Sequence, residues 1–367
     1  MTDAAKIRAE AEALQAVFLH ADAVPVDAPI LVRADTLLDL YGEDIRARAY
    51  TTHDPDRGEL MMRPDFTVPV VERHMESGAD PARYTYLGEV FRMQQAGSDR
   101  PTEYLQVGYE VFDGSNPLKV DAEVFALMSQ ALSGIGARPV TGDIGLLLAA
   151  IEALSTTDAR KAALRRHVWR PRRFRALLDR FTGVSAAPAG REHYLSAAQE
   201  RGLAALIAEA GPPIGLRTTD EMTARLARLK DEADALPLPA AEAEALAGLL
   251  SLKTSLSEAE NVLQDFCVDL PDLAPAVSRF GLRNRALREA GLDPNDLPFE
   301  ASYGRSQMEY YDGFVFGFMS PTPGGVPIAT GGRYDALTRA LGGGREIPAV
   351  GGVIRPERVV AAREGLA

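Results

Sequence analysis

The segment "RYTYLGEVFRMQQAGSDRPTEYLQVGYEVFD", residues 83–113, contains two strand-like runs on either side of a polar loop. Successive side chains of a strand point to opposite faces. The second run therefore has an apolar face made of Leu105, Val107, Tyr109 and Val111. Its other face carries Tyr104, Gln106, Gly108, Glu110 and Phe112. Gln106 and Glu110 lie about 13 Å apart at ~3.3 Å per residue, and Gly108 leaves a hollow between them.

The first run has a matching face, formed by Tyr84, Tyr86, Gly88, Val90 and Arg92. Pairing the two strands would give a floor with Arg92, Gln106 and Glu110 at its rim. A glycine inside a strand often marks the close approach of a ligand or of another backbone. The loop, about residues 93–102, is also longer than a tight hairpin requires. The pattern is typical of a ligand floor, and equally of an antiparallel sheet with one face in water.

A second polar patch lies in "LMMRPDFTVPVV", residues 60–71. Arg63, Asp65 and Thr67 alternate there, and Pro64 and Pro69 interrupt the segment. The oxygens of Asp65 and Thr67 are suitable acceptors for an ammonium group. An edge strand with ordinary turn residues would give the same pattern.

The order of patterns along the chain predicts an α+β fold. Strand and helix patterns mix up to residue 145, Ala, Leu, Arg and Glu recur at helical spacing over 146–300, and strand patterns return from residue 308. We expect one antiparallel sheet domain flanked by helices, formed by 1–150 and 300–367, with a largely helical insertion at 151–299.

Three shorter segments carry local signals. Residues 1–23 have the pattern of an amphipathic helix and lack the apolar core of a signal peptide. In "GGRYDALTRALGGG" a glycine pair opens a short predicted helix that ends in three glycines. In "PAVGGVIRPERVVAARE" a strand leads into a helix, with Pro356 in the first helical turn.

Composition limits the function classes. The 367 residues carry a formal net charge of −12 and one cysteine, Cys267. A disulfide framework and a multi-cysteine zinc site are thus excluded, and we predict no metal site and no cofactor. No stretch reaches the ~18 apolar residues of a membrane span. The sequence predicts a cytoplasmic protein with no membrane partner.

One basic segment stands out against the acidic total. Residues 159–180 contain Arg160, Lys161, Arg165, Arg166, Arg170, Arg172, Arg173, Arg175 and Arg180. A solvated helical face, a surface for a partner subunit and an anion site are all consistent with this pattern. We expect no nucleic-acid partner, because only Trp169 and Phe174 are available for base stacking.

Five segments resemble those of class II histidyl-tRNA synthetases and come in the same order. They are "LMMRPDFTVPVVER", "YLGEVFRMQQ…RPTEYLQVGYEVF", "YYDGFVFGF", "GGRYDAL" and "PAVGGVIRPERV". "VFRMQQ" is similar to the start of class II motif 2, "AVGGVIRPERV" to motif 3, and "PVDAPILVRADTLLDLYG", with Pro29, more weakly to motif 1. The resemblance runs from about residue 10 to the end, apart from the helical block.

The departures from that pattern concern ATP. Motif 2 usually reads FRxE, but Gln94 replaces the acid. Ser306 stands where the synthetases usually have a catalytic arginine, and Arg305 is one residue away, a shift that turns a strand side chain to the other face. Arg355 occupies a position where glycine usually leaves room for adenine. Only nine residues follow Arg358, so the resemblance does not extend to an anticodon-binding domain.

This combination resembles the regulatory subunits of ATP phosphoribosyltransferase, which are synthetase-like but do not charge tRNA. The resemblance implies a non-catalytic subunit that a separate, short-form catalytic ATP phosphoribosyltransferase subunit requires in the first step of L-histidine biosynthesis. It also implies a hetero-oligomer, feedback by histidine and a homodimer of this chain. An active synthetase-like enzyme that aminoacylates a non-standard acceptor is the main alternative, and an amino-acid sensor with another partner is a third.

The resemblance also suggests residues that bind free histidine: Asp65, Thr67, Arg92, Gln106, Glu110, Tyr310 and Tyr311. Asp65 and Thr67 suit the α-ammonium group, Arg92 suits the α-carboxylate, and Glu110 or a tyrosine hydroxyl suits an imidazole N–H. The other interpretation is a relic pocket whose polar groups are hydrated.

Overall fold

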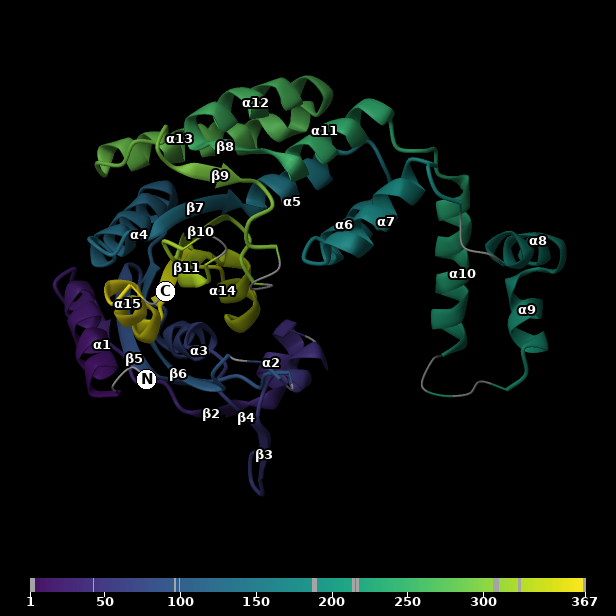
Figure 1. Cartoon of the computed structure of the whole chain (residues 1–367). Coiled ribbons are helices and arrows are strands. Elements are labelled where there is room, and N and C mark those ends of the chain that lie inside the picture. The colour runs from purple at the N-terminus through teal and green to yellow at the C-terminus, as the bar shows by residue number, and fades with distance from the viewer. Residues whose placement is uncertain are drawn as a thin grey trace. The chain divides into compact units, whose positions relative to one another are not determined.

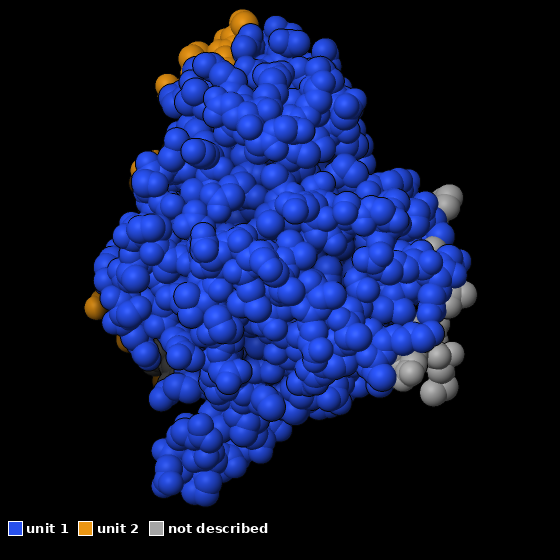
Figure 2. Space-filling view, turned by 90° about the vertical axis from the view of Figure 1, so that its left-hand side faces the viewer, with its two compact units in different colours: residues 1–146, 250–265, 274–367 blue, residues 147–249, 266–273 orange. Residues whose placement is uncertain are grey.

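The computed structural model describes residues 4–41, 43–95, 97–98, 100–186, 190–212, 215, 218–305, 310–322 and 325–365. The chain divides into two compact units (Figure 2). Unit 1 comprises residues 1–146, 250–265 and 274–367, and unit 2 comprises 147–249 and 266–273. Among the described helices, none combines the length and the apolar composition that crossing a bilayer requires.

A nine-stranded sheet forms the centre of unit 1 (Figure 1). In spatial order its strands are β1 (Val24–Pro25), β5 (Ala82–Phe91), β6 (Glu103–Phe112), β12 (Ala349–Ile354), β11 (Pro327–Arg333), β10 (Phe314–Met319), β7 (Arg138–Asp143), β9 (Pro298–Glu300) and β8 (Lys253–Ser255). All neighbours are antiparallel except β1 with β5 and β7 with β9. A smaller sheet joins β2 (Leu31–Arg33), β4 (Gly58–Met62) and β3 (Thr51–Asp54). The predicted antiparallel α+β core is confirmed.

The predicted pairing of the two strands in 83–113 is also confirmed. β5 and β6 pair with Tyr84 opposite Glu110, Tyr86 opposite Gly108 and Gly88 opposite Gln106. These residues therefore share one face of the sheet. The opposite face of β6 is apolar, and its Tyr109 stacks on Phe18 with ring centroids 5.3 Å apart.

Helices cover both faces of this sheet (Figure 1). On the Tyr109 side lie α1 (Ala4–Leu19), α4 (Pro117–Ala131) and α15 (Pro356–Arg363), and α13 (Ala274–Glu289) packs on α4. The Glu110 side carries α3 (Thr67–Ser77), which packs on α14 (Asp335–Leu341). Pro356 occupies the first helical turn of α15, as predicted, because its fixed φ suits that position.

Unit 2 is helical, as the repeat of Ala, Leu, Arg and Glu predicts. It contains α6 (Asp158–Arg166), α7 (Pro171–Phe181), α8 (Arg191–Arg201), α9 (Leu203–Glu209) and α10 (Thr219–Asp234), and most of α5 (Ile144–Ala153) and α11 (Ala240–Ser251). The expected insertion at 151–299 also includes most of α12 (Leu256–Asp269) and all of α13, which belong to unit 1.

Two local expectations differ from the structure. In residues 60–71 the strand ends at Met62 and helix α3 begins at Thr67, so that Asp65 lies in the turn between them. The pair Gly331–Gly332 lies within β11 and does not open the following helix. A Cβ atom at Gly331 would be 2.2 Å from the Phe316 ring and 2.4 Å from the Gly351 carbonyl oxygen, which explains the glycine in the strand.

Buried ion pairs connect the sheet to its helices. Arg333 in β11 donates to Asp121 of α4 through Nε at 2.9 Å and pairs with it through Nη2 at 2.7 Å. It also contacts Asp335 at 3.0 Å. Asp121 is fully buried, and Arg333 is 7% exposed. A buried charge is tolerated only with such partners, so the pair fixes α4 against the sheet.

We expect Arg333→Met to lower the free energy of unfolding by about 3–5 kcal/mol, because Asp121 would lose its nearest cation while remaining buried. Arg339→Met on α14 is the matched control. It breaks an exposed pair with Glu346 and should change stability by no more than ~0.5 kcal/mol. Urea unfolding followed by near-ultraviolet circular dichroism measures both, and equal effects would contradict a structural role for the buried pair.

Candidate functional site

The carboxylate of Glu110 lies on the inner face of β6 and is 1% exposed. Three hydroxyl groups donate to it: Thr67 Oγ1 at 2.9 Å, Tyr86 OH at 3.0 Å and Tyr334 OH at 2.6 Å. These donors come from the start of α3, from β5 and from the residue before α14. Residues distant in the sequence therefore meet at one acceptor.

Glycines on the neighbouring strands make room for this cluster. A Cβ atom at Gly351, opposite Glu110 in β12, would lie 1.5 Å from Glu110 Oε2. A Cβ atom at Gly108 would lie 2.1 Å from Cζ of Tyr86. The predicted hollow over Gly108 is therefore filled by the Tyr86 ring, which approaches the sheet closely because no side chain is in its way.

Burial controls the protonation of this carboxyl group. It raises the pKa of Glu110 to about 7, and the hydrogen bonds from Tyr334, Thr67 and Tyr86 oppose the rise. Desolvation disfavours the charged form, whereas donated hydrogen bonds favour it. Near neutral pH the group is thus divided between a carboxylate, which only accepts hydrogen bonds, and a carboxylic acid, which can also donate one.

Four of the predicted site residues gather around this point. Thr67 binds Glu110 directly, and Glu110 and Asp65 both raise the pKa of Tyr311, which burial raises most. Asp65 is 5% exposed, and its Oδ1 accepts from the Val68 amide at 3.4 Å at the start of α3. Tyr310 joins the group through Tyr311, with ring centroids 4.8 Å apart.

Gln106 and Arg92 lie farther along the same face. Gln106 is 1% exposed, and its Oε1 has no hydrogen-bond partner within the part of the chain that the structure describes. Buried amide oxygens normally accept a hydrogen bond, so Gln106 Oε1 is an acceptor that a ligand with an N–H or O–H group could use. Arg92 is half-buried, and its Nε donates to the Pro64 carbonyl at 2.8 Å.

A stack of side chains that the pattern did not identify covers the glycines. The Arg63 guanidinium lies 4.0 Å from the Phe66 ring centroid, and Phe66 stacks on Tyr86 at 4.3 Å with an interplanar angle of 8°. A Cβ atom at Gly88 would meet Arg63 Nη2 at 2.8 Å and Phe66 at 2.9 Å. The glycines at 88 and 108 were the only sequence signal for this close approach.

Arginines lie at the end of β12, where the sequence departs from the synthetase pattern. Arg355 Nη1 donates to the Pro327 carbonyl at 3.0 Å, and Arg358 donates to the same oxygen. Burial lowers the pKa of Arg358 to about 10, and Arg355 adds to this effect. Burial also lowers the pKa of Arg355, which has Tyr104 and Arg92 as neighbours. A guanidinium thus stands at this end of the floor, as the sequence predicts.

Of the two residues discussed for the usual catalytic arginine, the structure describes only Arg305. Ser306 lies outside the described residues. Arg305 is 7% exposed, and burial lowers its pKa.

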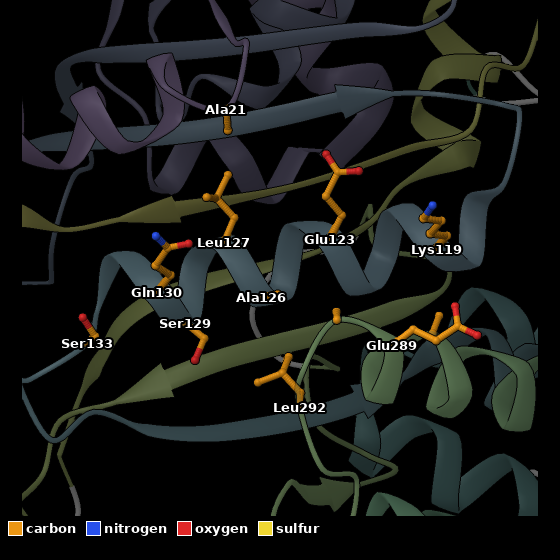
Figure 3. A pocket seen from close by; sticks show the side chains of 12 residues that line it. Ala21, Lys119, Glu123, Ala126, Leu127, Ser129, Gln130, Ser133, Glu289 and Leu292 are labelled. Carbon is orange, nitrogen blue, oxygen red and sulfur yellow. The ribbon is translucent and has the colours of Figure 1, made fainter.

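A hollow of about 640 Å³ lies elsewhere on unit 1 (Figure 3). Its lining comes mainly from α4 and the C-terminal end of α13, and includes Lys119, Glu123, Gln130 and Glu289. Because α4 covers the Tyr109 side of the sheet, this hollow is on the opposite side from Glu110. It is separate from the predicted amino-acid site.

Comparison with known proteins agrees with this architecture. The family model described as histidyl-tRNA synthetase matches residues 2–274 and 223–359. The ATP phosphoribosyltransferase regulatory subunit of Brucella anthropi is 32% identical over 357 residues, covering 92% of this chain and 93% of that protein. The subunit of the same name from Brucella canis is 32% identical over 351 residues, covering 92% of each.

Solved structures show the same fold. An ATP phosphoribosyltransferase regulatory subunit/histidyl-tRNA synthetase from Bacillus halodurans has a TM-score of 0.68 at 21% identity, covering 99% of this chain and 81% of that chain. Histidyl-tRNA synthetase from Nostoc has a TM-score of 0.62 at 15% identity, covering 98% and 72%.

The fold is thus that of a class II histidyl-tRNA synthetase-like protein. Within that class, the chain belongs to the family of ATP phosphoribosyltransferase regulatory subunits. The predicted family and the regulatory role in histidine biosynthesis are both confirmed by these relatives.

The raised pKa of Glu110 predicts a pH-dependent stability. The group titrates at about 7 in the folded protein but near ~4.3 in an unfolded chain. Its contribution to the free energy of unfolding is therefore complete below about pH 4 and is lost as pH rises through about 7, on the order of 4 kcal/mol in all.

Glu110→Gln is the comparison variant, because it keeps the size of the side chain and does not titrate. The difference in free energy of unfolding, native minus variant, should fall as pH rises from about 5 to about 8. Urea unfolding at several pH values measures this difference, and every other titrating group cancels from it. A difference that does not change with pH would show that Glu110 titrates normally.

Proposed function

We propose that this chain acts in the cytoplasm as the non-catalytic partner of a separate, short-form ATP phosphoribosyltransferase catalytic subunit. In the resulting hetero-oligomer the catalytic subunit would join ATP to phosphoribosyl pyrophosphate, and this chain would be required for that activity. The names of its relatives support a regulatory role, and the arginine at the end of β12 supports the absence of charging chemistry. Arg355 places a guanidinium where the synthetase pattern leaves room for adenine.

We further propose that free histidine binds on the Glu110 face and contributes to feedback. The observation that carries this proposal is the Oε1 atom of Gln106, a buried acceptor without a donor among the described residues. An imidazole N–H or an α-ammonium group would supply that donor. Thr67, Asp65, Tyr311 and Tyr310 supply further polar groups at the Glu110 end, and Arg92 supplies a cation for the carboxylate.

A homodimer of this chain is the third part of the proposal. Class II cores commonly pair through the motif 1 strand and its helix, and the segment that resembles motif 1, residues 25–42, begins at the second residue of β1. That strand is at one edge of the nine-stranded sheet, and Val24 in it is 59% exposed. An exposed edge strand with an apolar side chain is a suitable element for pairing with a second copy.

Mixing the purified chain with a short-form catalytic subunit tests the main proposal. The chain alone should form neither histidyl-adenylate nor phosphoribosyl-ATP, and the mixture should form phosphoribosyl-ATP from ATP and phosphoribosyl pyrophosphate. Product formation with and without histidine measures both activity and feedback. Robust exchange of pyrophosphate into ATP by the chain alone would contradict the proposal and favour an active synthetase-like enzyme.

Calorimetric titration with free histidine tests the site. Gln106→Leu should weaken binding about tenfold, because it removes the unsatisfied acceptor while keeping the volume of the side chain. Glu89→Gln is the matched control, since Glu89 is in the paired strand on the opposite face and pairs with Arg8; it should bind like the native chain. No heat from the native chain at millimolar histidine would identify the pocket as a relic.

A Glu110→Ala variant that keeps normal histidine inhibition would place the transmitting site elsewhere.

A further inference from the structure

The basic segment carries exposed arginines on two helices of unit 2: Arg165, Arg166, Arg172, Arg173 and Arg175. Arg160, by contrast, is buried. Helices α6 and α7 are consecutive and lie side by side, joined by a short turn at 167–170 (Figure 1). α7 is amphipathic: Phe174, Leu178 and Phe181 are buried, whereas Arg172, Arg173 and Arg175 are exposed. At about 3.6 residues per turn, the buried residues fall on one face of the helix and the three arginines on the opposite face, so the arginines point outward together.

Three exposed arginines here have no acidic partner. Arg165 pairs with Glu152 at 2.6 Å and Arg175 pairs with Asp179 at 3.1 Å. The side chains of Arg166, Arg172 and Arg173, by contrast, make no ion pair or hydrogen bond within the described ranges. Some exposed arginines elsewhere are paired, as in Arg33–Asp35, Arg57–Asp54, Arg201–Glu209 and Arg339–Glu346. Others, such as Arg225 and Arg228, have no ion pair among the described residues.

Several guanidinium groups of the segment lie close to one another. The pKa of His167 in the turn is lowered, by burial first and then by Arg170, Arg173 and Arg166. These three guanidinium groups therefore lie near the same imidazole, and no carboxylate is among the groups that shift its pKa. Like charges held together raise the free energy of the isolated chain, and a partner that supplies carboxylates would relieve this repulsion.

Exposed apolar side chains border the other end of the hairpin. Val184 follows α7 and is 81% exposed, and Leu236 is 84% exposed. The chain near Leu236 is fixed beside the hairpin, because its carbonyl accepts from Arg160 Nη1 at 2.7 Å and the Leu238 amide donates to the Phe181 carbonyl at 2.8 Å. α7 spans about 16 Å at ~1.5 Å per residue. A patch of the ~800 Å² that one partner contributes to an interface of standard size is roughly 28 Å on a side, so the helix fits within it.

We propose that this hairpin surface, residues 158–184 with Leu236, docks a carboxylate-bearing face of the catalytic ATP phosphoribosyltransferase subunit. The proposal rests on the proposed function and names the part of this chain that would carry it. Its arginines would pair with acids of the partner, and Val184 and Leu236 would pack against apolar side chains at its end. Apolar contact beside charged groups is the usual composition of a protein interface.

Two other occupants fit less well. Nucleic acid would need exposed aromatic rings for stacking. Phe174 is buried, Trp169 is only partly exposed, and the strongly exposed non-polar residues beside the hairpin, Val184 and Leu236, are aliphatic. A second copy of this chain would most simply pair about a two-fold axis. An axis through this surface would bring two arginine clusters together, which is unfavourable.

The test compares Arg172→Glu/Arg173→Glu with Arg225→Glu/Arg228→Glu in the full-length chain. The second variant changes the charge equally and lies on the exposed face of α10 in the same unit. Calorimetry with the short-form catalytic subunit should show binding weakened at least about tenfold, or about 1.4 kcal/mol, for the α7 variant, and little change for the control. Raising the salt concentration should narrow the difference between them. Val184→Ser/Leu236→Ser should weaken binding with little dependence on salt.

The outcomes separate the two proposals. If the native chain binds the catalytic subunit and the α7 variant binds equally well, the docking surface is wrong and the proposed function stands. If the native chain does not bind that subunit at all, the proposed function fails. Loss of self-association, or of binding to an RNA probe, without loss of binding to the catalytic subunit would assign the surface to one of those partners and overturn the proposal. Far-ultraviolet circular dichroism confirms folding of each variant.

Discussion

The hydrogen bonds to the Glu110 carboxylate are the constraint on which the central sheet depends. A carboxylate at 1% exposure is costly unless its oxygens are satisfied. Thr67, Tyr86 and Tyr334 satisfy them from α3, from β5 and from the chain just before α14. Gly351 of β12 makes the arrangement possible, because any larger residue would occupy the place of Oε2. One side chain thus fixes two strands and the starts of two helices.

The same arrangement bears on function. A carboxyl group that already accepts from three hydroxyl groups, with a pKa of about 7, has fewer positions left for an incoming ligand than an open carboxylate would have. The unsatisfied acceptor is instead Gln106, toward the other end of the floor. Beyond it Arg355 and Arg358 converge on the Pro327 carbonyl. The face thus retains polar groups for a small ligand and ends in two guanidinium groups.

Local patterns predicted the strands well because alternation between the two faces of a strand depends only on neighbouring residues. The alternation in β5 and β6 identified both faces, and the observed register places Gly88 opposite Gln106. The helical spacing of 146–300 and Pro356 likewise depend on neighbours a few residues away. Two expectations differ from the structure because they depend on tertiary contacts. Gly331–Gly332 is expected to open a helix, but the pair lies in a strand, where the Phe316 ring and a neighbouring backbone approach it closely. The turn at Asp65 depends on α3, which ends the strand early.

The sequence by itself determined the class of fold, the face that carries Gln106 and Glu110, and the replacement of a small residue by Arg355. It could not show that Tyr86 fills the hollow over Gly108, that Tyr334 donates to Glu110, or that Arg63 and Phe66 cover Gly88. The physical reason is chain separation. Alternation between faces repeats every two residues, whereas the donors to the buried Glu110 come from 24 residues away for Tyr86, 43 for Thr67 and 224 for Tyr334.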